Sequence, residues 1–288
     1  MLLTDWIYNT LATNEKRGFM SLKFRLATYL RNFFLKFSDP FVNYKIGSSV
    51  IKMSLSHQLG LYRKSYTQYS TNPARIAELI KEKYADLTFL DIGSNIGDSI
   101  PFLREKSFFP ILAIEGEEEF YSILEKNTSN LEDVQVCKAF IGEKKESSMR
   151  SFVKVGGTAH SLTAQDGKEV CTETLEDILD KFPVFKKSKM IKIDTDGFDC
   201  KIIRGARDYL SKVQPIIFFE YFPDLLEKQN DDGISVFDTL FEWGYTKMLV
   251  YNNLGTFLYS INLDDKVHVQ EMHSYFSGNY YCDIPSPK

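Results

Sequence analysis

Short, nearly continuous apolar runs alternate with amphipathic segments from residue 88 onward. The apolar runs occupy residues 88–92, 111–115, 134–140, 189–194 and 215–220. Between them, helical periodicity falls at about 97–106, 117–127, 174–181 and 198–211. Runs that are apolar throughout are typical of parallel strands buried on both faces. The alternation therefore predicts an α/β fold with a mostly parallel sheet covered by helices.

Two segments depart from this alternation. Residues 141–172 mix Gly, Ser and charged residues, which predicts irregular strands or loops over the functional site. Near the C-terminus, runs at 246–251, 256–261 and 278–284 are separated by turn signals. We expect these runs to close the edge of the sheet as antiparallel strands.

The region before residue 88 has a different pattern. A hairpin is predicted over 41–56, where alternating residues flank a Gly-Ser turn. The Tyr-, Ser- and Gln-rich stretch 57–75 predicts a loop or irregular lid. Pro73 then predicts the start of a helix that runs to about residue 83, with Asn72 as its N-cap.

Segment 19–37 predicts an amphipathic helix without acidic residues. Its apolar face comprises Leu22, Leu26, Tyr29, Leu30, Phe33 and Phe37. Its basic residues, which lie mostly off that face, are Lys23, Arg25, Arg31 and Lys36. Three uses of the apolar face stay open: contact with anionic lipid, a dimer contact, or packing on the protein's own core.

Charge is unevenly distributed along the 288 residues. Residues 1–75 contain eleven Lys/Arg and three Asp/Glu, a balance of +8, which leaves −12 for the rest of a chain whose net charge is −4. A basic arm is expected to face an anionic partner, such as a membrane surface or a charged glycan precursor, or the protein's own acidic body. We therefore divide the chain into an N-terminal extension, 1–72, and an α/β domain, 73–288.

Other compositional signals concern the cellular compartment. No run approaches the roughly 20 apolar residues of a transmembrane helix, and the N-terminus lacks the basic region of a secretory signal. The four cysteines are scattered without metal-type spacing, which is typical of reduced thiols. We expect a cytoplasmic protein, and attachment to the inner face of the membrane stays open.

Residues 88–98, TFLDIGSNIGD, run from an apolar strand into a glycine loop flanked by acids. A dinucleotide site requires a middle glycine where this loop has Asn95, and a P-loop requires a Lys that is absent here. Glycine turns with carboxylates, and with no basic residue for phosphate, suit a cationic cofactor without phosphate. S-adenosylmethionine fits this description. The predicted cofactor-binding residues of the loop are Asp91, Gly93, Ser94, Asn95, Gly97 and Asp98.

A second part of the cofactor site is predicted at the end of the next strand. Glu115 follows Asp91 by 24 positions, one strand–helix–strand unit further on. A carboxylate at that place can accept hydrogen bonds from both ribose hydroxyls. We include its neighbour Gly116, and Ala139 and Phe140 at the end of the third strand, in the predicted cofactor site.

The remaining strand ends carry the predicted chemistry. Methyl transfer from a sulfonium is an in-line displacement in which the enzyme aligns the groups and accepts a proton from a hydroxyl acceptor. The candidate bases are Asp194, Asp196, Glu220 and, in the GGTAHS loop, His160. Lys192 lies within a strand, where its charge must be paired or must face the site. A Mg²⁺ ion held by Asp194, Asp196 and Glu220 stays an open alternative.

Together these segments resemble the FkbM family of S-adenosylmethionine-dependent methyltransferases. The resemblance rests on FLDIGSNIGD (89–98), AIEGEEEFYSILEKN (113–127), TLEDIL (174–179), IKIDTDGFDCKIIRGARDYL (191–210) and PIIFFEY (215–221), in the family's order. The NYYCDI near the end also resembles the family's C-terminal strand. Two positions depart from the family's pattern: Gly116 stands where Pro is usual, and Asp196 where Glu is usual.

The resemblance implies a class I methyltransferase fold, a Rossmann-like, mostly parallel sheet with an antiparallel C-terminal strand. It implies that Asp91, Gly93, Asn95 and Gly97 surround the methionine end of the cofactor and that Glu115 binds its ribose. It also implies O-methylation of a sugar hydroxyl in a glycan or glycosylated metabolite. The acidic catalytic half disfavours a nucleic-acid acceptor. Two other functions stay open: N-methylation of a protein or nucleic acid, and a non-catalytic cofactor-binding subunit of a glycan-assembly complex.

Overall fold

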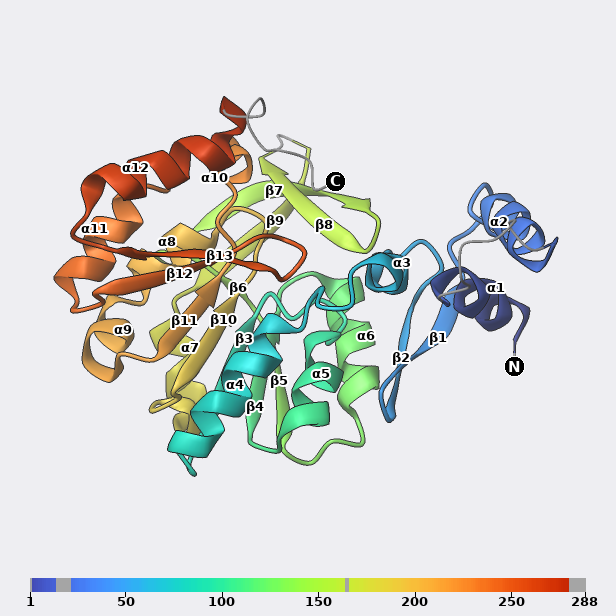
Figure 1. The fold of residues 1–288 in the computed structure, drawn as a ribbon, viewed down its shortest axis with the longest axis horizontal. Coiled ribbons are helices and arrows are strands. Elements are labelled where there is room, and N and C mark those ends of the chain that lie inside the picture. Colours follow the sequence, from blue (N-terminus) through green and yellow to red (C-terminus); the bar gives the residue numbers. More distant parts are fainter. Residues whose placement is uncertain (1, 14–21, 164–165, 280–288) are drawn as a thin grey trace.

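A five-stranded parallel sheet forms the centre of the molecule (Figure 1). The computed structural model describes residues 2–13, 22–163 and 166–279. The strands are β3 (Phe89–Ile92), β4 (Ile111–Glu115), β5 (Val134–Lys138), β10 (Met190–Ile193) and β11 (Ile216–Phe219), in the order β11-β10-β3-β4-β5. All neighbouring pairs are parallel. The strand order reverses between β3 and β10, and ligands of such sheets bind at this switch point.

Helices cover both faces of the sheet. The helices on one face are α4 (Asn72–Lys83), α5 (Ser99–Lys106) and α6 (Glu118–Thr128). Those on the other face are α7 (Leu175–Lys181), α8 (Asp199–Gly205), α9 (Arg207–Val213) and α11 (Ser235–Glu242). Phe89 packs toward the first face and Leu90 toward the second, as the two-residue period of a strand requires. The predicted α/β fold class is confirmed. The helix expected over 198–211 is divided into α8 and α9, because the backbone leaves helical geometry at Ala206.

The segment expected to be irregular, 141–172, forms a regular mixed sheet. Strands β6 (Phe140–Ile141), β7 (Ser147–Val155), β8 (Thr158–Thr163) and β9 (Lys168–Glu173) pair in the order β6-β9-β7-β8. Strand β7 pairs antiparallel with β8 and β9, and β6 pairs parallel with β9. His160 is consequently not in a flexible loop: its backbone lies in β8, opposite Val153 of β7. Polar residues on both faces of these strands explain why the sequence did not predict them.

The N-terminal extension consists of α1 (Leu3–Ala12), α2 (Leu22–Phe34), β1 (Phe41–Ile46), β2 (Ser49–Ser54) and α3 (Leu59–Ser65). The predicted hairpin is confirmed, with β1 and β2 joined at Gly47 and Ser48. The stretch predicted as a loop contains α3, and Asn72 is the first residue of α4 instead of its N-cap. Figure 1 shows α1 and α2 at one end of the molecule.

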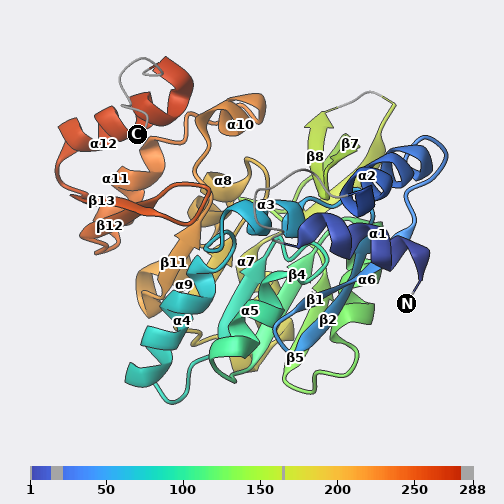
Figure 2. The same ribbon diagram turned by 45° about the vertical axis from the view of Figure 1, so that its right-hand side comes forward.

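The extension is joined to the α/β domain by packing and by one amide side chain. Ile7, Tyr8 and Met53 belong to the same hydrophobic cluster as Phe102 of α5, so the core is continuous across residue 72. The Asn127 side chain of α6 accepts from Lys52 N–H (2.8 Å) and donates to the carbonyls of Lys52 (2.9 Å) and Ile96 (2.8 Å). One side chain thus connects β2, which lies beside α6 (Figure 2), to the glycine loop after β3.

The C-terminal part adds α10 (Pro223–Lys228), the strands β12 (Lys247–Tyr251) and β13 (Phe257–Asn262), and α12 (Lys266–Ser274). β12 and β13 pair with each other, antiparallel, in a separate ribbon instead of extending the central sheet at β11. Residues 275–279 are helical, and the remainder of the run predicted over 278–284 lies outside the described residues. Within the described ranges, every helix is too short or too polar to cross a bilayer.

Candidate active site

The loop between β3 and α5 contains two glycines that no other residue could replace without movement. Gly93 has φ +75°, and a Cβ atom there would lie 1.9 Å from the carbonyl oxygen of Asp194. Gly97 has φ +81°, and its Cβ would lie 2.8 Å from Leu124 of α6. Left-handed backbone and close approach both require glycine. The loop therefore presses against the loop that follows β10 at the switch point.

Asn95 stands between these glycines and joins three parts of the site. Its φ of +51° is one that Asn tolerates better than most residues. Its backbone N–H donates to Glu115 Oε2 (2.8 Å), and its Nδ2 donates to the carbonyl of Gly157, in the turn between β7 and β8 (2.8 Å). Asn95 Oδ1 is buried and has no hydrogen-bond partner among the residues that the structure describes. The loop thus offers an acceptor to a ligand with a donor group.

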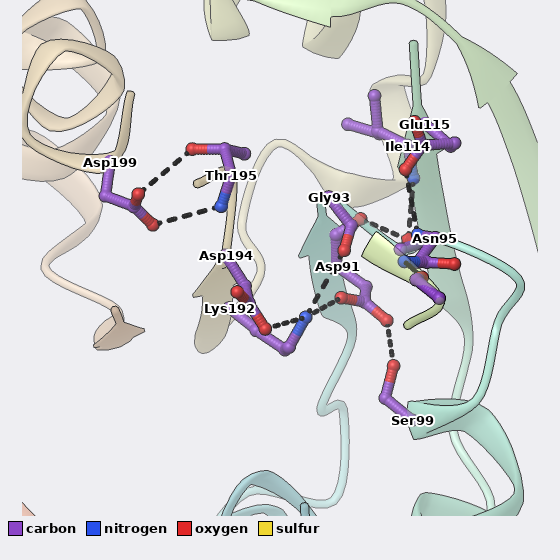
Figure 3. A network of polar contacts seen from close by, with 12 residues as sticks. Asp91, Gly93, Asn95, Ser99, Ile114, Glu115, Lys192, Asp194, Thr195 and Asp199 are labelled. Atoms are coloured by element: carbon purple, nitrogen blue, oxygen red, sulfur yellow. Dashed lines mark hydrogen bonds and ion pairs between the residues drawn. The ribbon is translucent and has the colours of Figure 1, made fainter. Parts of the chain in front are cut away.

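Glu115 lies at the end of β4, where the sequence predicts the ribose carboxylate (Figure 3). Besides the bond from Asn95, its Oε1 accepts from the backbone N–H of Glu117 (2.8 Å). Burial raises the pKa of Glu115 to about 7, although these N–H groups act in the opposite direction. Two fixed donors orient the carboxylate and leave it lone pairs for two further hydroxyl donors.

Gly116 and Phe140 form a tightly packed wall next to Glu115. A Cβ atom on Gly116 would lie 2.3 Å from Phe140 Cδ1, so the aromatic ring covers the glycine directly. The Phe140 ring stacks on Phe152 of β7, with centroids 5.5 Å apart and planes at 23°. Ala139 N–H donates to the carbonyl of Glu115 (3.1 Å). The glycine found in place of the family's usual Pro is thus explained by the ring that packs on it.

We expect Gly116→Ala to lower the free energy of unfolding by about 1–3 kcal/mol, because the added methyl group displaces the Phe140 ring. Urea denaturation measures the change. In the Phe140→Ala background, the same substitution should cost much less, and equal costs in both backgrounds would contradict the proposed contact.

Lys192 of β10 is buried between two carboxylates (Figure 3). Its Nζ lies 3.1 Å from Asp91 Oδ1 and 3.3 Å from Asp194 Oδ2. Asp91 is fully buried, and its Oδ2 accepts from Ser99 Oγ at 2.5 Å. The expectation that Lys192 is paired is therefore confirmed. Both Asp91 carboxylate oxygens thus have protein partners, and Asp91 stabilises the conformation of the glycine loop that follows it.

The other two predicted loop residues have different surroundings. Ser94 is buried, its hydroxyl donates to the carbonyl of Asp91 (2.7 Å), and it accepts from Ile114 N–H (3.1 Å). Asp98 precedes α5, and burial raises its pKa to about 6, against the opposing effect of Lys192. Ser94 thus fixes the loop to β4. Asp98 adds a carboxyl group of raised pKa that interacts with Lys192, Asp91 and Asp194.

Three carboxylates lie at the ends of β10 and β11. Asp194 is exposed, Asp196 has φ +53°, and Glu220 directly follows β11. Burial raises the pKa of Glu220 well above its usual range, and the negative charge of Asp194 adds to this effect. Glu220 Oε2 is buried without a hydrogen-bond partner in the described part of the chain. This oxygen is the second buried acceptor that the site leaves available.

The turn that carries Asp194 and Asp196 is held by Asp199. Its carboxylate accepts from Thr195 N–H (3.3 Å), Thr195 Oγ1 (3.2 Å) and Gly197 N–H (3.3 Å). Gly197 is required here, because its φ is +101° and a Cβ would lie 2.5 Å from the carbonyl of Leu225. Asp199 therefore orders the turn.

Sequence reasoning missed Tyr69, which comes from the extension. Burial raises the pKa of Tyr69 to about 12, and the negative charges of Asp98, Asp194 and Glu220 add to this effect. Its ring stacks on Tyr62, with centroids 5.1 Å apart. The only sequence signal was the Tyr-rich composition of 57–75, because the interaction with these acids joins residues far apart in the chain.

The site has no metal centre among the residues described: no three His, Cys, Asp or Glu side chains are placed to bind an ion. The set Asp194, Asp196 and Glu220 therefore does not fit the Mg²⁺ alternative. His160 lies three residues beyond Gly157, the hairpin residue bound by Asn95. The structure thus brings the cofactor loop, Glu115, Phe140 and the strand-end acids to one edge of the sheet.

This arrangement, a Rossmann-like sheet with a non-dinucleotide glycine loop and an acid after the second strand, defines a class I S-adenosylmethionine-dependent methyltransferase. Residues 91–247 match the Methyltransferase FkbM domain. The match covers more than half of the chain, and the protein belongs to this family of methyltransferases.

Solved structures with similar chain traces have methyltransferase names. Precorrin-6y C5,15-methyltransferase from Geobacter metallireducens is 17% identical, with 61% of this chain and 72% of that chain covered and a TM-score of 0.36. An O-methyltransferase from Bacillus cereus in complex with SAH is 15% identical, with 65% and 78% covered and a TM-score of 0.37. A putative caffeoyl-CoA O-methyltransferase from Staphylococcus aureus is 12% identical, with 63% and 79% covered and a TM-score of 0.39. No curated protein matches the chain.

Proposed function

We propose that the protein transfers a methyl group from S-adenosylmethionine to a hydroxyl group of a sugar, in a glycan or a glycosylated metabolite. The observation that carries this proposal is Glu220, at the end of β11, whose buried Oε2 has no hydrogen-bond partner among the described residues. A hydroxyl acceptor must lose its proton during transfer, and a carboxylate of raised pKa is suited to accept it.

The cofactor residues fit the donor. When bound, S-adenosylmethionine supplies a methyl group attached to a sulfonium sulfur. Glu115 is oriented to accept from the ribose hydroxyls, and Asn95 Oδ1 is available to a donor group. The Phe140 ring provides an apolar wall beside Gly116 for the adenine.

The acceptor oxygen forms a bond to the methyl carbon while the carbon–sulfur bond breaks and the sulfur keeps the electron pair. The hydroxyl proton passes to Glu220, which is protonated once per turnover. Lys192 is paired with the adjacent Asp194, which holds this second carboxylate near the acceptor. Alignment and proton removal are together the two contributions required of the protein.

A sugar acceptor is favoured by the surroundings of Glu220. Asp194 and Asp196 are hydrogen-bond acceptors for neighbouring hydroxyls, and the stacked rings of Tyr62 and Tyr69 offer a flat apolar surface with polar tips. The balance of −12 outside residues 1–75 disfavours a nucleic acid. The alternative reaction, methylation of an amine nitrogen in a protein or nucleic acid, is distinguished from sugar O-methylation by the experiment below.

The test is a transfer assay with isotopically labelled S-adenosylmethionine and separate sugar, peptide and nucleic-acid acceptors. We expect label in the sugar fraction, in an ether that survives base treatment and is recovered as an O-methyl sugar after acid hydrolysis. Label recovered only in peptide or nucleic-acid nitrogen would overturn the sugar proposal. Binding of the cofactor without transfer to any class would instead indicate the non-catalytic subunit.

We expect the affinity for S-adenosylhomocysteine to rise with pH and to level off above about pH 7, the pKa of Glu115. Ribose hydroxyls donate best to the ionised carboxylate, so binding favours loss of its proton. Glu115→Gln should weaken binding at alkaline pH by about 10- to 100-fold and remove this pH dependence. Calorimetry at several pH values measures both effects. The matched control is Glu118→Gln, which changes an exposed carboxylate nearby in the chain. An unchanged pH profile in Glu115→Gln would remove Glu115 from the ribose site.

A further inference from the structure

Helix α2 turns its large apolar side chains away from the protein. Leu22 is 81% exposed and Tyr29 68% exposed, and Leu26 and Phe33 are each about half exposed. These residues are spaced three or four positions apart, so they form one stripe along the helix. Phe37, just beyond the helix, is 77% exposed and its ring lies 5.3 Å from that of Phe33. We call these five residues the α2 stripe.

The opposite side of α2 makes the contacts with the fold. Ala27 is fully buried, and Phe24 and Phe34 pack against the core shared with α1. Arg31 also points inward, where it donates to the carbonyls of Leu55 (3.2 Å) and Ser56 (3.1 Å). The helix is thus anchored by one face. Of the predicted apolar set, Leu30 packs against the core, whereas the five residues of the α2 stripe are exposed.

Basic residues flank the α2 stripe. Arg25 and Lys36 lie on one side of it and Lys23 on the other, all three exposed, and the sequence has no acidic residue between Lys16 and Ser38. A helix with an apolar ridge and basic flanks fits the interface of an anionic bilayer, where the ridge enters the acyl region and the cations meet headgroup phosphates.

A second copy of this chain fits the surface less well. The stripe is a convex ridge of five side chains, whereas stable dimer interfaces use roughly 20–30 residues on each side. In a symmetric dimer through this face, Lys23, Arg25 and Lys36 of one copy would lie near the same three residues of the other. These six like charges would repel one another. The charge pattern therefore favours lipid over protein.

We propose that the α2 stripe seats the protein on an anionic lipid surface, with Lys23, Arg25 and Lys36 at the headgroups. The proposal is independent of the acceptor, because it concerns the extension and not the site. It selects one of the alternatives that the sequence left open, attachment to the inner face of a membrane.

The experiment is co-sedimentation of the full chain with phosphatidylcholine vesicles that contain or lack phosphatidylglycerol, at low and high salt. We expect binding to the anionic vesicles alone, weakened by salt. Leu22→Ser/Phe33→Ser should reduce the partition coefficient about tenfold or more, and Arg25→Ser/Lys36→Ser about thirtyfold. The control variant Leu79→Ser/Val267→Ser removes two exposed apolar residues from α4 and α12, outside the stripe. It should leave the partition coefficient unchanged.

Binding of S-adenosylhomocysteine and the unfolding midpoint verify that each variant is folded. Absence of wild-type binding to anionic vesicles at low salt would overturn the proposal. So would equal losses in the stripe variant and its matched control. A wild-type dimer in sedimentation equilibrium that becomes a monomer in Leu22→Ser/Phe33→Ser, without vesicle binding, would assign the face to a second copy instead.

Discussion

Replacing Glu220 by Gln is expected to lower kcat for methyl transfer by about 10²–10⁴-fold, the usual contribution of a general base. The amide cannot accept the proton of the acceptor hydroxyl, although it has nearly the same shape as the carboxylate. Because the role proposed for Glu220 is proton transfer and not cofactor binding, binding of S-adenosylhomocysteine should be nearly unchanged.

Single-turnover transfer with the sugar acceptor, together with calorimetry, measures the two quantities. The pH profile supplies a second readout. Burial and Asp194 raise the pKa of Glu220, and the ionised form is the active one, so wild-type kcat/KM should increase with pH until Glu220 is fully ionised. Glu271→Gln on α12 is the control for loss of one carboxylate. Full kcat in Glu220→Gln would assign the base to another residue, with Asp194 the next to test.

Replacing Lys192 by Met should lower the free energy of unfolding by about 3–5 kcal/mol. The substitution leaves Asp91 fully buried without its cation, and it leaves Asp194 without its partner. A buried carboxylate without a counter-charge is strongly unfavourable, so the native state must take up a proton or admit water. Urea denaturation at neutral pH measures the loss.

The double variant Lys192→Met/Asp91→Leu keeps the prediction testable if the single variant does not fold. Two apolar residues of similar volume remove the charge and its partner together, and replacement of a whole buried pair is often neutral or stabilising. The double variant should therefore be more stable than Lys192→Met alone. Equal stabilities would contradict the prediction that the unpaired Asp91 carboxylate causes the loss in Lys192→Met.

Local sequence patterns were sufficient for the central sheet and for much of the site. The expected run 111–115 coincides with β4, and the other four strands agree within two residues, because each run is apolar on both faces. Glu115 was identified for the same reason: a strand end fixes the position of the residue that follows. The glycine loop was found because Gly93 and Gly97 have backbone angles and contacts that only glycine allows.

Contacts between distant segments were not predictable. Asp91 and Lys192 face each other only because β3 and β10 pair in a specific register, 101 positions apart in the chain. The electrostatic interaction of Tyr69 with Asp98, Asp194 and Glu220 depends on how the N-terminal extension packs on the α/β domain. The sheet β6-β9-β7-β8 lacks a regular apolar alternation, so no local pattern marked its strands. In these places tertiary context, not local preference, determines the structure.

The contact between Gly93 and the carbonyl of Asp194 has a consequence for altering what the enzyme acts on. The donor loop and the loop with the acids meet backbone to backbone, so substitutions in one displace the other, and the reacting geometry tolerates little redesign. Tyr62 and Tyr69 lie before residue 91, outside the matched family domain. Under the proposed function, the tyrosine part of the acceptor surface can be changed without touching either loop, so libraries aimed at new acceptors should vary residues 62–71 and leave both loops intact.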